Sequence, residues 1–116
     1  MIKYESLKKN RDFRLVYHSG RSKVNRLFVM IVRENDRPVN RYGISVSKKV
    51  GNSVVRHRIK RVVREIIRLN NDYISQGYDI VIVGRSESAS GDYQKMKSAI
   101  RHLLNLHHLL SDDYPI

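Results

Sequence analysis

The sequence predicts an α+β fold: one domain over residues 1–116, with helices packed on a mixed four-stranded sheet in the order α-β-β-β-α-β-α. A length of 116 residues suits one hydrophobic core. Apolar residues recur at helical spacing in three segments, and strand-like segments lie between them. No internal repeat or low-complexity linker divides the chain. We therefore expect a single-domain α/β sandwich.

The first expected helix covers residues 7–20. Phe13 and Tyr17 lie four residues apart, which places both on one face of a helix. Asn10 is a candidate N-cap, and Gly20 is expected to end the helix in a left-handed turn.

Two or three strands are expected next. Residues 27–32 are apolar on both faces, which indicates a central strand. Residues 34–41 have turn composition, and residues 41–47 then alternate between larger apolar and small side chains. The segments 27–32 and 41–47 are expected to pair as antiparallel neighbours.

The longest expected element is a helix that begins after the N-cap Asn52 and runs to about Leu69. At helical spacing its apolar residues form one stripe, which is expected to pack on the core, and its basic residues lie opposite and on the flanks. The stripe consists of Val55, Ile59, Val62, Val63 and Ile66, and the basic residues are Arg56, Arg58, Lys60, Arg61, Arg64 and Arg68.

The rest of the chain predicts a strand over residues 78–84, a Ser-rich loop over residues 85–91, and a last helix capped by Asp92 that frays near Pro115. Crossovers between parallel strands are right-handed by strong general preference. This preference alone predicts a right-handed connection through the long basic helix.

The composition points to a polyanionic partner. Lys and Arg number 23 against 11 Asp and Glu, which gives a net charge of +12, in a chain with ordinary apolar content. Cysteine is absent, which suits a reducing compartment. Residues 1–10 lack a signal-peptide core, and the apolar run 27–32 is too short to span a bilayer. We therefore expect a cytoplasmic protein without a membrane partner.

The basic helix favours nucleic acid as that partner. Crowded like charges weaken an isolated helix, and phosphates would neutralise them. Lys48 and Lys49 precede the helix, and its N-terminal N–H groups beside Asn52 add a favourable dipole. A membrane helix would expose the apolar residues that this helix needs for the core. A solvated charged face is the alternative interpretation.

A second candidate surface lies on the first helix and the sheet. Bases could stack on Phe13 and Tyr17, although the spacing alone favours packing of both residues between the helix and the sheet. Gly43, Ser45 and Ser47 share one strand face, where small side chains would admit a nucleic-acid strand or simply face solvent. His57 lies among arginines and is interpreted as a polar RNA contact.

No catalytic or metal site is expected in this chain. The five histidines show no zinc-ligand spacing, and there is no cysteine to join them. The sequence contains no P-loop, no dinucleotide-binding glycine motif and no nucleophile elbow.

Residues 46–65, VSKKVGNSVVRHRIKRVVRE, resemble the signature of the protein component of bacterial ribonuclease P, which centres on an Arg-Asn-Arg triplet. The segments 7–13, LKKNRDF, and 78–83, YDIVIV, support the resemblance. His57 stands at the position of the triplet Asn, and Ile31 stands where relatives can carry an aromatic residue. The resemblance implies a fold like domain 2 of ribosomal protein S5, with a left-handed crossover.

The resemblance also implies a function. The family's protein binds a catalytic RNA, which carries the chemistry with magnesium, and the complex removes the 5′ leader of precursor tRNA. No cofactor of the protein and no obligate protein partner are implied. The residues expected at the RNA subunit are Lys48, Lys49, Asn52, Arg56, His57, Arg58, Lys60, Arg61, Arg64 and Arg68. The residues expected at the leader are Phe13, Tyr17, Val29, Ile31, Ser45 and Ser47. A structural RNA-binding protein of the ribosomal type is the alternative, and a protein-only nuclease is a third.

Overall fold

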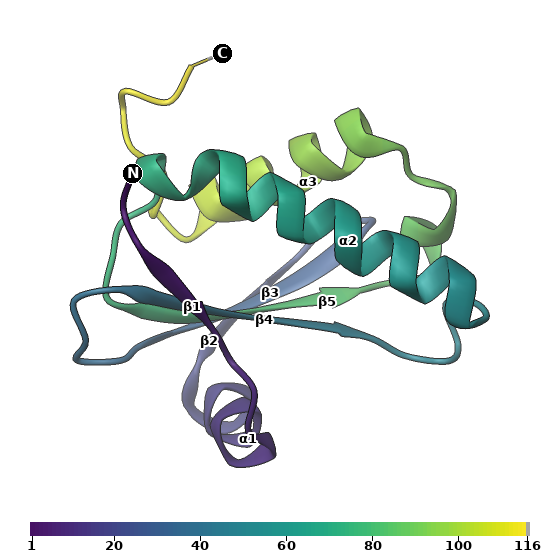
Figure 1. Ribbon diagram of the computed structural model, residues 1–116, viewed down its shortest axis with the longest axis horizontal. Coiled ribbons are helices and arrows are strands. Elements are labelled where there is room, and N and C mark those ends of the chain that lie inside the picture. Colours follow the sequence, from purple (N-terminus) through teal and green to yellow (C-terminus); the bar gives the residue numbers. More distant parts are fainter. Residues whose placement is uncertain (116) are drawn as a thin grey trace.

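The computed structural model describes residues 1–115 as one five-stranded mixed sheet, with α1 on one face and α2 and α3 on the other (Figure 1). The strands are β1 (Tyr4–Ser6), β2 (Arg21–Val24), β3 (Phe28–Glu34), β4 (Asn40–Val46) and β5 (Tyr78–Gly84). The helices are α1 (Asn10–Ser19), α2 (Ser53–Asn70) and α3 (Tyr93–Leu106), with short 3₁₀ helices η1 (Asn71–Tyr73) and η2 (Ser86–Ser90). The predicted α+β class is confirmed. A short N-terminal strand makes the sheet five-stranded instead of four-stranded.

The strand order β1-β4-β5-β3-β2 corrects one prediction. The expected antiparallel pairing of segments 27–32 and 41–47 is wrong, because β5 lies between β3 and β4. It runs antiparallel to β3 and parallel to β4. The consecutive residues Ile80, Val81 and Ile82 are all buried, so both faces of β5 need cover and the strand takes the middle of the sheet.

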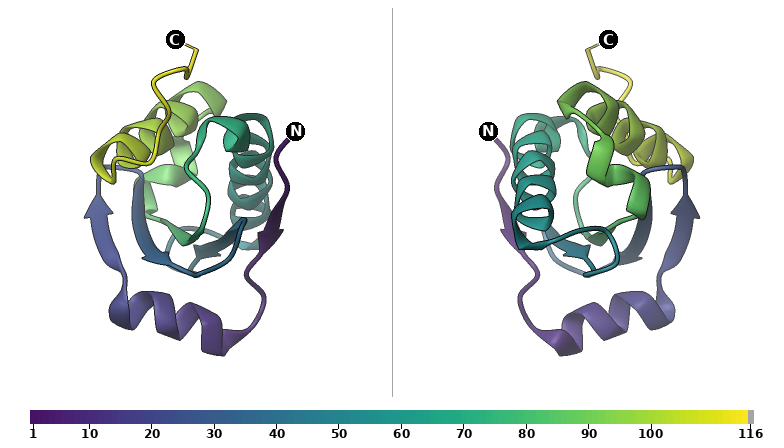
Figure 2. Two further views of the ribbon diagram at one scale, coloured as in Figure 1. Left: turned by 90° about the vertical axis from the view of Figure 1, so that its left-hand side faces the viewer. Right: turned by 90° about the vertical axis from the view of Figure 1, so that its right-hand side faces the viewer.

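The crossover from β4 through α2 to β5 is left-handed. In Figure 1 both strands run from left to right, α2 returns above the sheet, and β5 lies behind β4. The end views of Figure 2 show the same arrangement, with α2 above the β1 side of the sheet. The default right-handed connection is therefore wrong for this chain, and the handedness implied by the family resemblance is confirmed.

Two predicted helix caps are confirmed, and two predicted ends are wrong. Asn52 accepts a 3.0 Å hydrogen bond from the Val55 N–H, and Asp92 accepts one of 2.9 Å from the Lys95 N–H. The N-cap of α1 is Lys9 instead of Asn10, and it makes no side-chain cap bond. The last helix ends at Leu106, well before Pro115.

Gly20 ends α1, but for a different reason from the predicted left-handed turn. Its backbone is extended, with φ −82° and ψ 165°. A Cβ atom at Gly20 would lie 2.5 Å from the carbonyl oxygen of Val16 and 2.7 Å from Cγ2 of Ile31. Close approach of the chain to the sheet therefore requires glycine at this position.

The sheet separates two apolar cores. The larger lies under α2 and α3 and contains Phe28, Ile59, Ile82 and Leu103. The smaller lies under α1 and contains Leu7, Val16, Ile31 and Val81. Because α1 is a short helix of 10 residues, it covers only part of its face of the sheet. No helix among residues 1–115 has the length and apolar content that crossing a bilayer would require.

Candidate nucleic-acid interface

The basic residues of α2 lie where the helical periodicity predicts them. Ile59, Val63 and Ile66 are buried against the sheet, and the opposite side of the helix faces solvent. Seven of the predicted basic residues have no carboxylate within salt-bridge distance among residues 1–115, and six of these also make no side-chain hydrogen bond there. These six are Lys48, Lys49, Arg56, Lys60, Arg61 and Arg64. His57 is exposed on the same side. This surface is called the cationic face below. Its exposed side chains can meet phosphates, whereas Arg56 is half-buried and its Nε is buried without a hydrogen-bond partner among residues 1–115.

Three of the predicted RNA-contacting residues are engaged within the protein. Arg68 forms a hydrogen-bonded ion pair with Glu65, at 2.5 Å between Nη2 and Oε1. Arg58 donates hydrogen bonds to carbonyl oxygens of the loop between β5 and α3. Asn52 uses its side-chain oxygen as the N-cap of α2. The structure therefore places these three beside the cationic face, with their polar groups already committed.

The sheet face that carries α1 is organised as three rows of side chains across the strands. The first row contains the charged residues Arg33, Asp79 and Arg41, which are register partners. The second row contains Ile31, Val81 and Gly43. The third row contains Val24, Val29, Val83 and Ser45. Side chains that are paired across strands share a face, so the rows lie side by side.

The second row lies beneath α1. Ile31 is only 8% exposed and packs with Val16, so it offers no surface to a nucleotide. A Cβ atom at Gly43 would lie 2.6 Å from the ring of Phe13, so Phe13 rests directly on the Gly43 backbone. Burial of Ile31 removes it from the predicted leader surface, because α1 crosses the sheet at this row.

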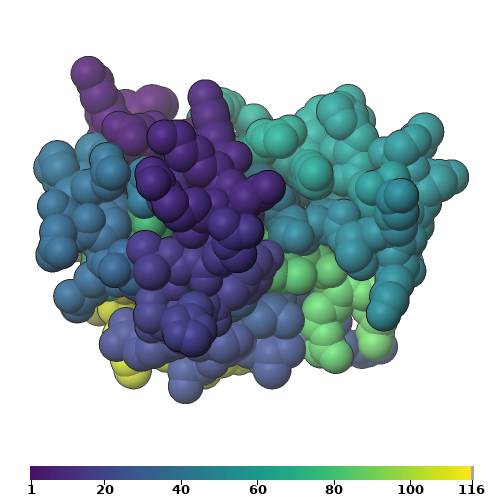
Figure 3. Space-filling view, turned by 90° about the horizontal axis from the view of Figure 1, so that it is seen from below, coloured from purple at the N-terminus to yellow at the C-terminus, as the bar shows by residue number. Residues whose placement is uncertain are grey.

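The third row stays open and forms the floor of a groove. Val24 is 55% exposed, and Val29, Val83 and Ser45 are half-buried. Phe13 and Tyr17 form the wall, with ring centroids 6.5 Å apart, and Tyr17 is 45% exposed. Figure 3 shows α1 over the middle of this face, with α2 (teal) and the segment after β5 (green) to one side. This surface is called the open groove below.

The open groove contains four of the six residues predicted for the leader. Phe13, Tyr17, Val29 and Ser45 come together there, and Ser47 lies exposed just past the end of β4. The prediction missed Val24 and Val83. Val24 and Val83 are the register partners of Val29, so both extend the floor of the open groove. Val83 lies there because β5 pairs with β3, and the local sequence does not show that pairing.

The first row, which contains the charged residues, helps to hold α1 on the sheet. Arg41 binds Asp79 with two hydrogen bonds of 2.8 and 2.6 Å and approaches Asp12 of α1 at 3.6 Å. Burial opposes the charged form of Asp79, but hydrogen bonds from Arg41 and Asn35 and the Arg41 charge bring its pKa below its usual value. The hydrogen bond to Asp79 raises the pKa of Arg41. An ion pair under the far flank of α1 thus helps to set the position of the groove wall.

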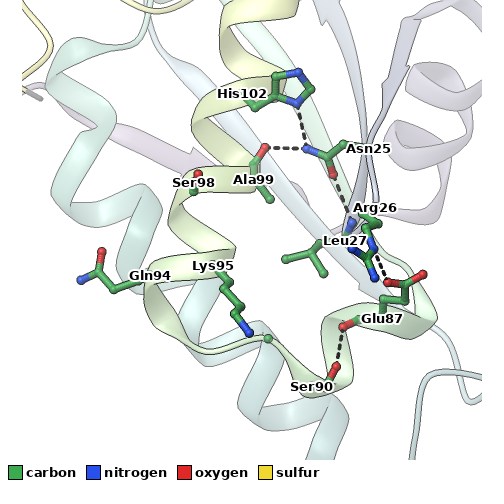
Figure 4. Close-up of a pocket in the computed structure, with 11 residues that line it drawn as sticks. Asn25, Arg26, Leu27, Glu87, Ser90, Gln94, Lys95, Ser98, Ala99 and His102 are labelled. Carbon is green, nitrogen blue, oxygen red and sulfur yellow. Dashed lines mark hydrogen bonds and ion pairs between the residues drawn. The ribbon is translucent and has the colours of Figure 1, made fainter.

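A further hollow lies away from both surfaces. It has a volume of about 730 Å³ and lies between the β2–β3 turn, η2 and α3 (Figure 4). Asn25 donates hydrogen bonds to the Ala99 carbonyl oxygen and contacts His102, and an Arg26–Glu87 ion pair of 2.6 Å lies at its rim. Asn25, Arg26, Glu87 and Ser90 are thus engaged in hydrogen bonds or an ion pair within the protein.

No group of three His, Asp or Glu side chains within residues 1–115 is placed to hold a metal ion. His107 is buried, and its Nε2 lies 2.9 Å from the Met30 carbonyl oxygen. Burial lowers the pKa of His107, so this histidine is a neutral structural group.

A cationic helix and a separate aromatic groove on one small α+β domain with a left-handed crossover define a basic nucleic-acid-binding protein. Comparison with known proteins narrows this class. The family model for ribonuclease P matches residues 1–107, and the chain belongs to that family. As a member, it is part of an endoribonuclease complex and has an RNA partner.

Similar proteins cover nearly the whole chain. The ribonuclease P protein component of Lachnoclostridium phytofermentans is 50% identical over 111 residues, which is 96% of each chain. That of Alkaliphilus oremlandii is 46% identical and covers 90% of this chain and 92% of its own. The Staphylococcus aureus RNase P protein superposes with a TM-score of 0.85 at 34% identity, over 91% of this chain and 97% of its own. The alternative of a ribosomal-type protein is not favoured.

Proposed function

We propose that this protein binds the catalytic RNA of ribonuclease P through its cationic face and holds the 5′ leader of precursor tRNA in its open groove. The RNA subunit, with magnesium, carries the chemistry of leader removal in the cytoplasm. The protein supplies no catalytic residue. It lowers the electrostatic repulsion between two RNA molecules and positions the single-stranded leader.

The observation that supports this proposal best is the partial cover that α1 gives the sheet. The helix buries the row of Ile31 and leaves the row of Val29 open beside the half-exposed Tyr17. An apolar floor with an aromatic wall binds bases by stacking with little sequence preference. Such a surface suits a protein that must accept many leader sequences.

The cationic face supports the other half of the proposal. Its six lysines and arginines have no acidic partner within residues 1–115, although the chain contains 11 Asp and Glu. The guanidinium group of arginine can donate two parallel hydrogen bonds to two oxygens of one phosphate. The cationic face and the open groove lie on different elements, so each can hold a different RNA.

The test is binding and cleavage by the protein reconstituted with its RNA subunit. We expect precursor tRNA to bind more tightly than mature tRNA, and the difference to require Tyr17. Arg61→Gln should weaken assembly with the RNA subunit and leave the ratio of precursor to mature affinity unchanged. If both variants change the same quantity, the two surfaces do not have separate roles. Leader removal by the protein without RNA would contradict the assignment of chemistry to the RNA.

A further inference from the structure

A small pocket lies at the outer edge of β4, and Phe13 is one of the residues that line it. It has a volume of about 200 Å³ and is lined by Tyr4, Ser6, Phe13, Tyr42, Ile44 and Arg64, among others. Pockets for drug-sized ligands usually measure roughly 300–1,000 Å³. The pocket therefore suits one planar ring system.

Backbone groups at the rim of this pocket lack a strand partner. β1 pairs only with Asn40–Tyr42 of β4, and the Leu7 N–H donates a 2.8 Å hydrogen bond to the Tyr42 carbonyl oxygen. N–H and C=O groups along a strand point to alternate sides, so those of Ile44 point to the same side as those of Tyr42. Beyond Ser6, no strand among the described residues pairs with the backbone N–H and C=O groups of Ile44. Ile44 thus presents an adjacent donor and acceptor.

The pocket walls are aromatic. Tyr4 packs edge-to-face on Tyr42, with ring centroids 5.6 Å apart. The Tyr42 hydroxyl donates to Asn71 at 2.7 Å and accepts from Asn40 at 3.1 Å, so its polar group is used inside the protein. Burial raises the pKa of Tyr42, which therefore stays neutral. Phe13 contributes to this pocket and to the wall of the open groove, so the two surfaces are continuous.

A free positive charge stands beside the aromatic walls. Arg64 is exposed and has no carboxylate partner within residues 1–115. Arg56 and Lys60 precede it at four-residue intervals, so the three form one row on the same flank of α2. A phosphate of a strand that follows the β4 edge would meet this row.

We propose that this pocket binds one unstacked nucleobase of the precursor leader, at the point where the leader passes Phe13 out of the open groove. The backbone N–H and C=O of Ile44 pair with the edge of the base, the aromatic rings contact its faces, and Arg64 binds the neighbouring phosphate. Every base offers donors or acceptors on its edge, so the site does not require one particular base. The inference rests on the proposed function, because it takes leader RNA as the ligand.

The test uses the reconstituted complex and precursors that carry 2-aminopurine at one leader position at a time. Stacking on an aromatic ring quenches this fluorescent base, so the position in the pocket should be quenched on binding. We expect Tyr4→Ser to restore its fluorescence and leave the positions in the open groove quenched. Arg64→Gln should weaken binding of a long-leader precursor about five- to tenfold more than binding of a precursor truncated before this position. The smaller loss for the truncated precursor reflects the place of Arg64 in the cationic face.

Arg61→Gln is the matched control, since Arg61 lies on the same helix but does not line the pocket. It should lower affinity for long-leader and short-leader precursors alike, through weaker assembly. Equal effects of Arg64→Gln on both precursors would overturn the inference, because Arg64 would then act only through assembly with the RNA subunit. If the wild type does not distinguish precursor from mature tRNA, the proposed function itself fails. Thermal unfolding of Tyr4→Ser shows whether its fold is intact, and Arg64→Gln, at an exposed residue, provides an independent test.

Discussion

The guanidinium group of Arg58 donates a 2.7 Å hydrogen bond to the carbonyl oxygen of Ala89. A second bond of 3.2 Å reaches the carbonyl oxygen of Gly91. Arg58 therefore ties the N-terminal half of α2 to the loop that enters α3. Its place among basic residues predicts an RNA contact, and these two hydrogen bonds give it a structural role as well.

Replacement of Arg58 by Gln should reduce stability more than it reduces RNA affinity. When a buried carbonyl oxygen loses a charged hydrogen-bond donor, the free energy of unfolding falls by roughly 1–3 kcal/mol. Urea unfolding should therefore show a loss of about that size for Arg58→Gln, and a change within about 0.5 kcal/mol for the exposed control Arg61→Gln. Equal stability of the two variants would contradict a structural role for Arg58.

The cationic face should make assembly with the RNA subunit strongly dependent on salt. Each phosphate neutralised contributes about 0.7–0.9 to the slope of log affinity against log salt concentration. Arg61→Gln should lower the slope by about that amount, since Arg61 has no acidic partner within residues 1–115. Arg68→Gln should lower it less, because Glu65 already neutralises Arg68. A titration of affinity from low to moderate salt measures both slopes.

Tyr17 gives the clearest test of the open groove. Tyr17 is 45% exposed, whereas Phe13 packs on Gly43, so truncation of Tyr17 should disturb the fold less. Loss of one stacking partner costs roughly 1–3 kcal/mol in single-stranded binding. Tyr17→Ala should weaken precursor binding accordingly and leave mature tRNA binding unchanged, as equilibrium binding of both RNAs would show. Equal loss for the two RNAs would place Tyr17 outside the leader site.

Gly43→Ala should move the groove wall without changing any side chain that contacts RNA. The new Cβ atom would lie 2.6 Å from the Phe13 ring, which has to shift. We expect a lower melting temperature and weaker precursor binding in the same variant. Ser45→Ala, on the same strand face but in the open row, should leave the melting temperature nearly unchanged. An unchanged Phe13 environment in NMR spectra of Gly43→Ala would argue against this packing.

His107 should make the fold less stable in mild acid. Burial lowers its pKa in the folded protein below the ordinary value of 6.5, so the unfolded chain binds protons more readily. Its contribution is complete above about pH 6.5 and is lost as the pH falls through the folded-state pKa. The free energy of unfolding should therefore decrease from pH 7.5 to 5, and less steeply in His107→Gln. Identical pH slopes would exclude His107 as the cause.

Local features of the fold could be predicted because their causes are local. The caps Asn52 and Asp92 act on N–H groups three residues away, and the apolar stripe of α2 follows helical periodicity. The place of β5 depends on pairing with strands more than 30 residues earlier, which no local pattern encodes. The missed floor residue Val83 follows from that same pairing.

The sequence could predict which residue types gather at the candidate site but not their full geometry. Charge spacing placed Arg61 and Arg64 on the cationic face, but it could not show that Arg58 is bound to backbone carbonyl groups. Alternation along β3 could not show which of Val29 and Ile31 lies under α1. The answer depends on where the helix crosses the sheet, which the Gly43 and Gly20 contacts determine.

The central position of β5 has a consequence for biosynthesis. The groove floor takes Val24, Val29 and Ser45 from the first half of the chain. β2 and β3 pair directly with each other, but β3 and β4 are joined only through β5, which is made of residues 78–84. A nascent chain that ends before this segment lacks the middle of its sheet, so contacts of long sequence separation must form late. The floor of the open groove is therefore completed only near the end of translation.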